Sequence, residues 1–362
     1  MSFCKFLTNT YHFTYDVVKP CCWIKDIKVN ISDHDAIKQE FKRLNAVDDW
    51  IPECEYCHKL ESAGTKSPRT ISLTDEPIFS DDDEPGIAIK VELQLDEDCN
   101  AACIMCSSFN STTWAKYNEN TVKAKKIKIH HHTTVDDRVA AVEAVVNFDT
   151  VKQVHFFGGE PFNTGTHLRI IRQIKHPENT RLVYVTNGST FPDHETLDLW
   201  SKFKHVHLMA SIDGVGEHFN YLRWPLQWAQ VEKNLARYRD MLGVKFQMNS
   251  SFTGSPLNLF YIDSYTAWAT EFFKSSRVDG SWWFMNPHPV VGVMNLNSVP
   301  DQLKTAITNK FSSDSRIVKI IDQFDSVKCQ KMIEYLDFHD VHRKLDWRQT
   351  FSEVAPYFSE DN

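Results

Sequence analysis

Three cysteines within eight residues are the part of this sequence whose type and spacing could do chemistry. Cys99, Cys103 and Cys106 are separated by three and then by two residues. They follow the stretch 91–95 (Val-Glu-Leu-Gln-Leu), whose alternation of apolar and polar residues predicts a half-buried strand. A loop at a strand end can turn its thiolates toward one centre, and soft thiolates favour iron–sulfur clusters or zinc over hard cations.

The number of cysteines in this loop favours one of the two metals. A structural zinc ion takes four protein ligands in a closed tetrahedron, usually from pairs of cysteines two residues apart. A cubane [4Fe–4S] cluster held by three cysteines has one iron that no protein side chain holds, so a small molecule can bind there. The spacing therefore favours a cluster with an open, catalytic iron.

The C-x3-C-x2-C spacing resembles the radical S-adenosylmethionine (SAM) enzymes, because a second motif of that family follows. This motif is Gly158-Gly159-Glu160-Pro161, which ends the short apolar stretch 154–157. The resemblance implies that the three cysteines hold a [4Fe–4S] cluster, that SAM binds the open iron, and that residues 158–161 receive the amino group of SAM. Without the resemblance, these four residues would be interpreted as a turn.

The resemblance also implies SAM contacts at other strand ends. Ser211 and Asp213 would hold the ribose hydroxyls, Arg223 would hold the carboxylate, and Met105 would pack on the adenine. An arginine fork suits a carboxylate because it pairs bidentately. The same region includes Asn187, although Asn-Gly and Asp-Gly are also ordinary turn dipeptides and an arginine can cap a helix.

A second group of cysteines lies in the first 75 residues. Four thiolates can converge there: Cys4, one of Cys21 or Cys22, Cys54 and Cys57. By ligand count the site fits structural zinc or an iron–sulfur cluster equally well. The segment resembles the twitch form of the SPASM/twitch radical SAM enzymes, which implies one auxiliary [4Fe–4S] cluster with Cys21 as ligand and Cys22 as a buried neighbour; zinc is the alternative.

Length and composition indicate a globular chain that is large enough for a buried core. The 362 residues are 42% apolar, with a formal charge of −8, so no basic surface for nucleic acid is expected. No apolar run approaches a membrane span, and the N-terminus does not have the pattern of a secretory signal. Nine cysteines, an odd number, favour metal ligation in a reducing compartment. A cytoplasmic protein is therefore predicted.

From residue 88 onward, strand and helix patterns alternate, which predicts parallel strands joined by helical crossovers. The expected strands are 87–95, 153–157, 181–186, 205–212, 244–252 and 281–285, and the expected helices between them are 136–148, 165–174, 194–202, 228–241 and 263–274. The fold class is α/β. The resemblance implies a partial (β/α)6 TIM-type barrel, with reactive residues at the carboxyl ends of the strands.

The expected domains are a cysteine-rich auxiliary domain (1–75) with one helix at 33–44, an acidic linker (76–87), the partial barrel (88–297) and a C-terminal helical segment (298–362). The C-terminal helices are expected at 302–311, 315–324 and from 329 onward. The triplet at 130–132, three histidines, is expected in a solvated loop, and the aromatic stretch 282–289 is expected at the substrate mouth or in the core. Cys329 is expected to be an inert buried thiol, with a hydrogen-atom donor as the alternative.

The resemblance implies an enzyme that reductively cleaves SAM to a 5′-deoxyadenosyl radical and abstracts a hydrogen atom from a substrate. It would need an external one-electron reductant of the flavodoxin or ferredoxin type. Family analogy favours a peptide substrate, and the alternative is a sugar, a nucleotide or another small molecule. A noncatalytic iron–sulfur or zinc protein is the remaining alternative.

Overall fold

The structure of the chain is a computed structural model. It describes residues 4–358 except 63, 65, 75–77, 81, 122–130, 242, 274–293, 295, 315–316, 319–320 and 322–328. The expected strand 281–285, the aromatic stretch 282–289 and most of the expected helix 315–324 lie outside the described residues.

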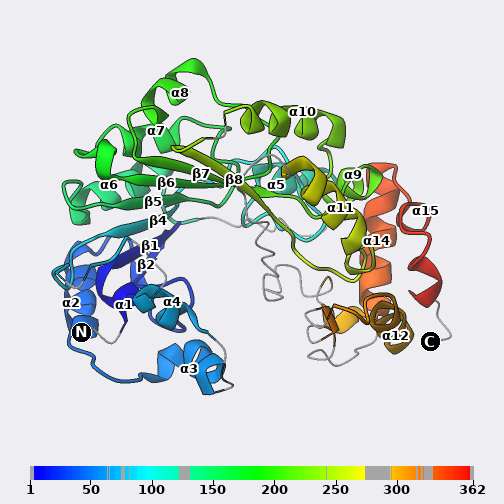
Figure 1. Ribbon diagram of the computed structural model, residues 1–362, viewed down its shortest axis with the longest axis horizontal. Helices are drawn as coiled ribbons and strands as arrows, with labels where there is room; N and C mark the ends of the chain where they lie inside the picture. The colour runs from blue at the N-terminus through cyan, green and yellow to red at the C-terminus, as the bar shows by residue number, and fades with distance from the viewer. Residues whose placement is uncertain are drawn as a thin grey trace.

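One eight-stranded sheet organises the described chain, in the order β3-β2-β1-β4-β5-β6-β7-β8 (Figure 1). Six strands are parallel: β1 (Thr10–Thr14), β4 (Lys90–Gln94), β5 (Gln153–Phe156), β6 (Arg181–Thr186), β7 (His205–Ser211) and β8 (Phe246–Ser251). The short strands β2 (Val17–Lys19) and β3 (Val29–Asn30) add an antiparallel edge. The α/β class with a parallel sheet is confirmed, and five expected strands are present.

Strand β1 was not expected from the sequence. It pairs with β4 from Thr10↔Lys90 to Thr14↔Gln94, so residues before the acidic linker belong to the same sheet as the barrel strands. The expected division of the chain at the linker stays a prediction.

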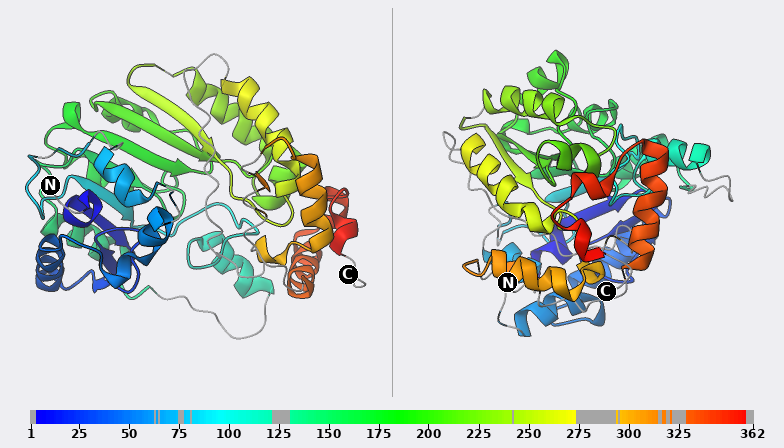
Figure 2. Two further views of the ribbon diagram at one scale, coloured as in Figure 1. Left: turned by 60° about the horizontal axis from the view of Figure 1, so that its bottom comes forward. Right: turned by 90° about the vertical axis from the view of Figure 1, so that its right-hand side faces the viewer.

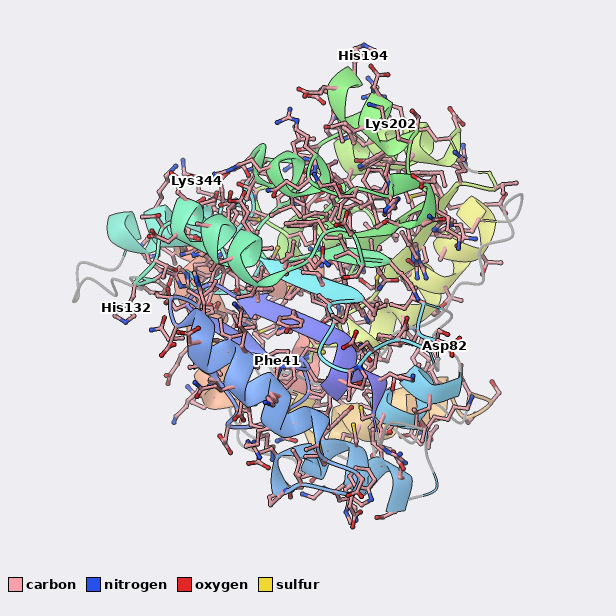
Figure 3. All side chains as sticks on the ribbon, turned by 90° about the vertical axis from the view of Figure 1, so that its left-hand side faces the viewer. Phe41, Asp82, His132, His194, Lys202 and Lys344 are labelled. Carbon is pink, nitrogen blue, oxygen red and sulfur yellow. The ribbon has the colours of Figure 1, made fainter. Side chains whose placement is uncertain are left out.

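The outer face of the sheet is apolar and covered by helices (Figures 1 and 2). These helices are α2 (His34–Asn45), α6 (Val135–Val145), α7 (Thr166–Ile171), α8 (His194–Trp200), α10 (Trp228–Arg239) and α11 (Ile262–Phe273). Alternate strand residues such as Val91 and Leu208 share one core with them. Phe41 on α2 (Figure 3) stacks on Tyr11 of β1 with ring centroids 4.1 Å apart, so α2 packs on the sheet at β1.

The opposite face, which we call the inner face, carries mainly polar side chains. Strand register sets them in rows across the sheet, one row being Thr10, Lys90, Gln153, Arg181 and His205, and the next His12, Glu92, His155, Val183, His207 and Gln247. Residues in a row stand directly opposite one another because the parallel strands have no offset.

Two further groups of helices lie at the ends of the arched sheet (Figure 1). On the N-terminal side are α1 (Lys5–Asn9), η1 (Pro52–Cys54), α3 (Glu55–Ser62) and α4 (Pro68–Thr74). On the C-terminal side are η5 (Leu296–Ser298), α12 (Asp301–Lys310), α14 (Gln330–Arg343), α15 (Trp347–Thr350) and η6 (Ala355–Phe358). The loops at the strand ends contain α5 (Thr112–Thr121), α9 (Glu217–Leu222), η2 (Pro177–Asn179) and η3 (Leu259–Tyr261). Within the described chain, every helix is too short or too polar to cross a membrane.

One expectation for a loop is wrong in part. His130 lies outside the described residues and His132 is exposed, but the side chain of His131 is only 6% exposed. Its ring lies 3.9 Å from the ring of Tyr15, between centroids. The carboxylate of Asp16 accepts hydrogen bonds from the backbone N–H groups of His132 and Thr133, which draws this loop onto the β1–β2 turn.

Candidate active site

The loop with the three cysteines lies at the carboxyl end of β4. Its backbone is fixed by α5, because Thr113 Oγ1 donates to the Cys99 carbonyl at 2.6 Å and Trp114 Nε1 donates to the Cys103 carbonyl at 2.8 Å. The segment after α9 holds it from another side, where Ala102 N donates to the Trp224 carbonyl at 2.7 Å. The cysteine positions are thus set by neighbouring elements as well as by the loop itself.

The three thiols lie near one another and near polar donors. Burial, with the neighbouring Cys103, raises the pKa of Cys106 to about 12 and also raises the pKa of Cys99. Arg223 Nη1 lies 3.9 Å from Cys103 Sγ, and Asn187 Nδ2 lies 4.0 Å from Cys99 Sγ. Buried thiols become thiolates when a metal binds them, so this donor set fits an iron–sulfur cluster.

Two glycines let the loop after β5 lie against this cysteine loop. A Cβ on Gly159 would lie 2.2 Å from the carbonyl oxygen of Asp98, and Gly158 has φ +117°. The two loops are joined by backbone hydrogen bonds from Gly159 N to Asp96 O (3.1 Å) and from Glu160 N to Asp98 O (2.7 Å). Only glycine permits this approach.

Glu160 is a buried carboxylate whose partners here are uncharged groups. One oxygen accepts from Thr186 Oγ1 at 2.8 Å and the other from the Asn187 backbone N–H at 2.7 Å. Burial raises the pKa of Glu160 to about 7. A buried carboxylate of this kind would bind an ammonium group favourably, because the cation stabilises its charged form.

Asp213 and Arg223 form an ion pair at the carboxyl end of β7. Arg223 Nη2 lies 2.6 Å from Asp213 Oδ2, and Asp213 Oδ1 accepts from Thr253 N at 2.9 Å. Oδ1 thus accepts a hydrogen bond and Oδ2 makes the ion pair, which suits Asp213 to orienting Arg223. The Nε of Arg223 is buried and has no hydrogen-bond partner in the described part of the chain, so it could meet an anion.

The other expected SAM-binding residues lie at the same edge of the sheet. Ser211 is the last residue of β7, Asn187 follows β6 directly, and Pro161 follows Glu160. Met105 is half-buried and packs against the main core. Their individual roles stay predictions.

Sequence reasoning did not anticipate the contact from helix α14. Tyr335 Oη donates to the Ile104 carbonyl in the cysteine loop at 2.9 Å. The Arg343 guanidinium lies 4.8 to 5.0 Å from the ring centroids of Trp114, Tyr117 and Trp224. More than 220 residues separate Tyr335 from Ile104, and no sequence motif marks the pair.

The four N-terminal cysteines line one cavity. Cys4, Cys21, Cys54 and Cys57 surround about 370 Å³ of empty space, part of it open to solvent, with Trp23 and Trp50 also in its wall. Burial raises the pKa of Cys4 and of Cys54 to about 12. The cavity and its four sulfur donors fit an auxiliary iron–sulfur cluster or a zinc ion.

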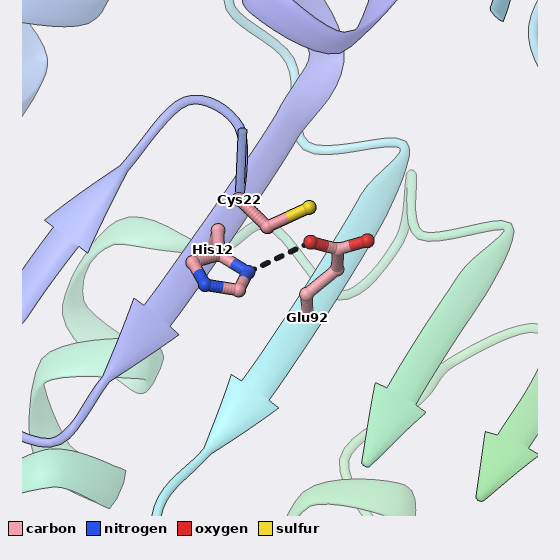
Figure 4. Close-up of side chains that lie close together, drawn as sticks. All are labelled: His12, Cys22 and Glu92. Atoms are coloured by element: carbon pink, nitrogen blue, oxygen red, sulfur yellow. Dashed lines mark hydrogen bonds and ion pairs between the residues drawn. The ribbon is translucent and has the colours of Figure 1, made fainter. Parts of the chain in front are cut away.

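Cys22 is exposed and is not the buried neighbour expected from the sequence. Adjacent residues point in different directions, and Cys22 faces His12 and Glu92, with all three donor atoms within 4.8 Å of one another (Figure 4). His12 Nδ1 lies 2.7 Å from Glu92 Oε2, and Lys90 Nζ lies 3.2 Å from Glu92 Oε1. Burial alone would raise the pKa of Glu92, but Lys90 and His12 outweigh it and lower the pKa. We interpret the group as an ion-pair network, since Lys90 already neutralises the carboxylate.

A family model and several solved structures resemble parts of this chain. No curated protein matches the chain in sequence. The structure of native anSMEcpe with bound AdoMet aligns with 51% of this chain, and the alignment covers 48% of the anSMEcpe chain. The sequence identity is 18% and the TM-score is 0.34. The structure of SuiB from Streptococcus suis, bound to its precursor peptide SuiA, aligns with 75% of this chain, and the alignment covers 61% of the SuiB chain. The sequence identity is 11% and the TM-score is 0.35. The chain thus spans about half the length of anSMEcpe. Residues 96–250, which include both glycines, all three cysteines and Arg223, match the family model described as the Radical SAM superfamily.

Proposed function

We propose that this chain is a radical SAM enzyme that acts on a peptide. One observation supports the activity. At the carboxyl ends of the strands, the buried carboxylate of Glu160 and the buried Nε of Arg223 lie near the three thiols of Cys99, Cys103 and Cys106. When bound, a [4Fe–4S] cluster and SAM supply a radical that removes a hydrogen atom from the substrate, after one electron from a flavodoxin- or ferredoxin-type reductant.

The residues of the chain would position these groups. The three cysteines would hold three irons, and Glu160 would accept the ammonium of SAM in place of its present neutral donors. Arg223, fixed by Asp213, would pair with the carboxylate. Ser211 and Asn187 would meet the ribose side, and Met105 the adenine. Such a site must hold the substrate C–H bond close and exclude water.

Anaerobic reconstitution with iron and sulfide, followed by SAM and dithionite, tests the activity. We expect release of 5′-deoxyadenosine, and we expect its loss in a variant with Cys99, Cys103 and Cys106 all changed to Ala. Cys329→Ala is the matched control, because Cys329 is a buried thiol at the N-terminus of α14. A clustered wild-type protein that releases no 5′-deoxyadenosine would favour a noncatalytic iron–sulfur protein.

An auxiliary [4Fe–4S] cluster in the N-terminal cavity is part of the proposal. It is supported by the four buried or half-buried cysteines around one cavity. Cys54→Ser with Cys57→Ser should lower the iron content from about eight to about four atoms per chain and leave the absorbance of the first cluster. If the purified protein instead contains one zinc ion per chain, and the same variant loses it, the site binds zinc and not a cluster.

The substrate class rests on the resemblance, with a sugar, nucleotide or other small molecule as the alternative. A gene for a short precursor peptide beside the gene for this chain would support the peptide. Neighbouring genes for sugar or nucleotide metabolism would support the alternative.

A further inference from the structure

A positive charge is buried beside the cysteine loop. Arg343 is the last residue of α14 and is only 6% exposed. All three of its guanidinium nitrogens, Nε, Nη1 and Nη2, are buried and have no hydrogen-bond partner in the described part of the chain. Buried charges are normally paired, because removing them from water is costly. The described chain alone therefore leaves this cation uncompensated.

The carboxylates on α14 bind other donors. Asp340 Oδ1 accepts from Tyr221 Oη at 2.7 Å, and its Oδ2 accepts from Trp347 N at 2.6 Å. Asp337 accepts from Trp347 Nε1 at 2.8 Å. Among the described residues, no carboxylate lies within hydrogen-bond reach of the Arg343 guanidinium. Acidic residues on its own helix thus do not supply the missing partner.

The guanidinium lies among three aromatic rings, which we call the aromatic cage. They belong to Trp114, Tyr117 and Trp224, with ring centroids 4.8 to 5.0 Å from Arg343 Cζ. The Tyr117 hydroxyl is hydrogen-bonded to His339 Nδ1 at 2.8 Å, and burial, with Arg343, lowers the pKa of His339 to about 3. Ring faces attract a cation, but these neutral groups do not neutralise its charge.

The aromatic cage also holds the cysteine loop. Trp114 Nε1 donates to the Cys103 carbonyl, and the Trp224 carbonyl accepts from Ala102 N. Arg343 is close enough to Cys103 to oppose the effect of burial on the pKa of its thiol. The aromatic cage therefore places a permanent cation near one of the three candidate cluster ligands.

The other guanidinium near this thiol differs in one respect. Arg223 Nη1 lies 3.9 Å from Cys103 Sγ, but Arg223 forms an ion pair with Asp213. The carboxylate of Asp213 offsets much of that positive charge at a distance. Arg343 has no such ion pair in the described chain, so its charge acts more fully on its surroundings.

We propose that Arg343 raises the reduction potential of the cluster that Cys99, Cys103 and Cys106 would hold. This inference rests on the proposed function, which supplies the cluster. Three thiolates make such a cluster anionic, and the electron from the flavodoxin- or ferredoxin-type reductant adds one more negative charge. A nearby cation stabilises the reduced form more than the oxidised form, and net charge is among the factors that set the potential of a cluster.

Potentiometric titration of the anaerobically reconstituted full chain, followed by electron paramagnetic resonance of the reduced cluster, tests the proposal. We expect Arg343→Met to make reduction about tenfold less favourable, which lowers the midpoint potential by about 59 mV for one electron. Arg343→Lys keeps the charge and should stay near the wild-type potential. Arg348→Gln is the matched control, because this half-exposed arginine is already paired with Asp337.

The auxiliary cluster of the proposed function is an internal reference, since its potential should be the same in all four proteins. The titrations are repeated with Cys54→Ser and Cys57→Ser, so that only the signal of the first cluster is present. Circular dichroism verifies folding, and Arg343→Gln replaces Arg343→Met if the latter does not fold.

A packing role for Arg343 predicts a different pattern of potentials. If Arg343 only supported the aromatic cage, Arg343→Met and Arg343→Lys would both loosen it, and entering water would stabilise the reduced cluster and raise the potential. Equal potentials in wild type and Arg343→Met would overturn the inference, and so would one shift common to Arg343→Met and Arg343→Lys.

Release of 5′-deoxyadenosine, measured on the same samples, separates this inference from the proposed function. The expected shift in potential without release from the wild type would overturn the proposed function alone. Release together with equal potentials would overturn this inference alone. A folded wild-type protein that holds no cluster at the three cysteines would overturn both.

Discussion

Gly158 and Gly159 allow the loop after β5 to lie directly against the loop after β4, and the candidate site depends on that approach. The carbonyl oxygen of Asp98 occupies the space where a Cβ on Gly159 would stand. Backbone contact between the loops after β4 and β5 therefore positions the side chains that would bind the cluster and SAM.

We expect Gly159→Ala to abolish cluster retention. Its Cβ would lie 2.2 Å from a backbone oxygen, so one of the two loops must shift and carry Cys99 or Glu160 with it. Iron content and visible absorbance after anaerobic reconstitution measure the effect. Gly165→Ala is the control, because no atom lies within 4 Å of its added methyl group. Equal iron content in both variants would contradict the expectation.

We expect Glu160→Gln to weaken SAM binding by about ten- to a hundredfold while the iron content stays at the wild-type level. The amide oxygen can accept from the Asn187 backbone N–H while the amide NH2 donates to Thr186 Oγ1, but the side chain loses the charge that would attract an ammonium. Calorimetric titration with SAM on the reconstituted protein checks this. Unchanged affinity would show that the ammonium binds elsewhere.

At the scale of elements, helix α14 supports the cysteine loop from the far end of the chain. We expect Tyr335→Phe to lower the free energy of unfolding by about 1 kcal/mol, because the Ile104 carbonyl loses a buried hydrogen-bond donor. Urea unfolding measures the loss, and Tyr357→Phe, at a half-buried tyrosine in η6, is the control. If Tyr335→Phe releases iron to a chelator faster than the control, the hydrogen bond stabilises the cysteine loop. Equal rates of iron release would show that the hydrogen bond does not affect the loop.

The elements that the sequence predicted are those with strong periodicity. Strands β4 to β8 and helices α6, α8 and α10 combine apolar alternation or 3.6-residue spacing with clear ends, such as the Asp193 cap of α8. Strand β1, Thr-Tyr-His-Phe-Thr, alternates polar and apolar residues as β4 does, but it lies before the acidic linker, outside the run of alternating strand and helix patterns that indicated the parallel sheet. The contact of Tyr335 with Ile104 was missed for a different reason, since pairing across the chain leaves no local pattern.

At the scale of the whole molecule, one sheet separates two chemical environments. The outer face and its helices form the apolar core. The inner face carries the rows of polar and charged side chains, with the cysteine loop at the carboxyl ends of the strands and the N-terminal cysteine cavity on the other side. This arrangement buries histidines that cannot easily take up protons, because burial lowers the pKa of His155, His167 and His207 to about 4.

These histidines should make the native state less stable in mild acid. In the unfolded chain they titrate near pH 6.5, so between about pH 6.5 and pH 4 the unfolded state binds more protons than the native state. Their contribution to stability is therefore complete above about pH 6.5 and is lost as the pH falls toward 4, by about 1.4 kcal/mol per pH unit for each proton. The raised pKa of Glu160, about 7, acts in the opposite direction for one proton only.

Urea unfolding at pH 7 and at pH 5 measures this loss, and His167→Asn isolates one histidine of the set. His167 is 5% exposed and lies beside Tyr184, away from either group of cysteines in the proposal. We expect the free energy of unfolding of the wild type to fall between these pH values, and that of His167→Asn to fall by less because it lacks one proton-binding group. Identical slopes in the two proteins would mean that His167 takes up its proton equally in both states, and His167 would then not contribute to the acid sensitivity.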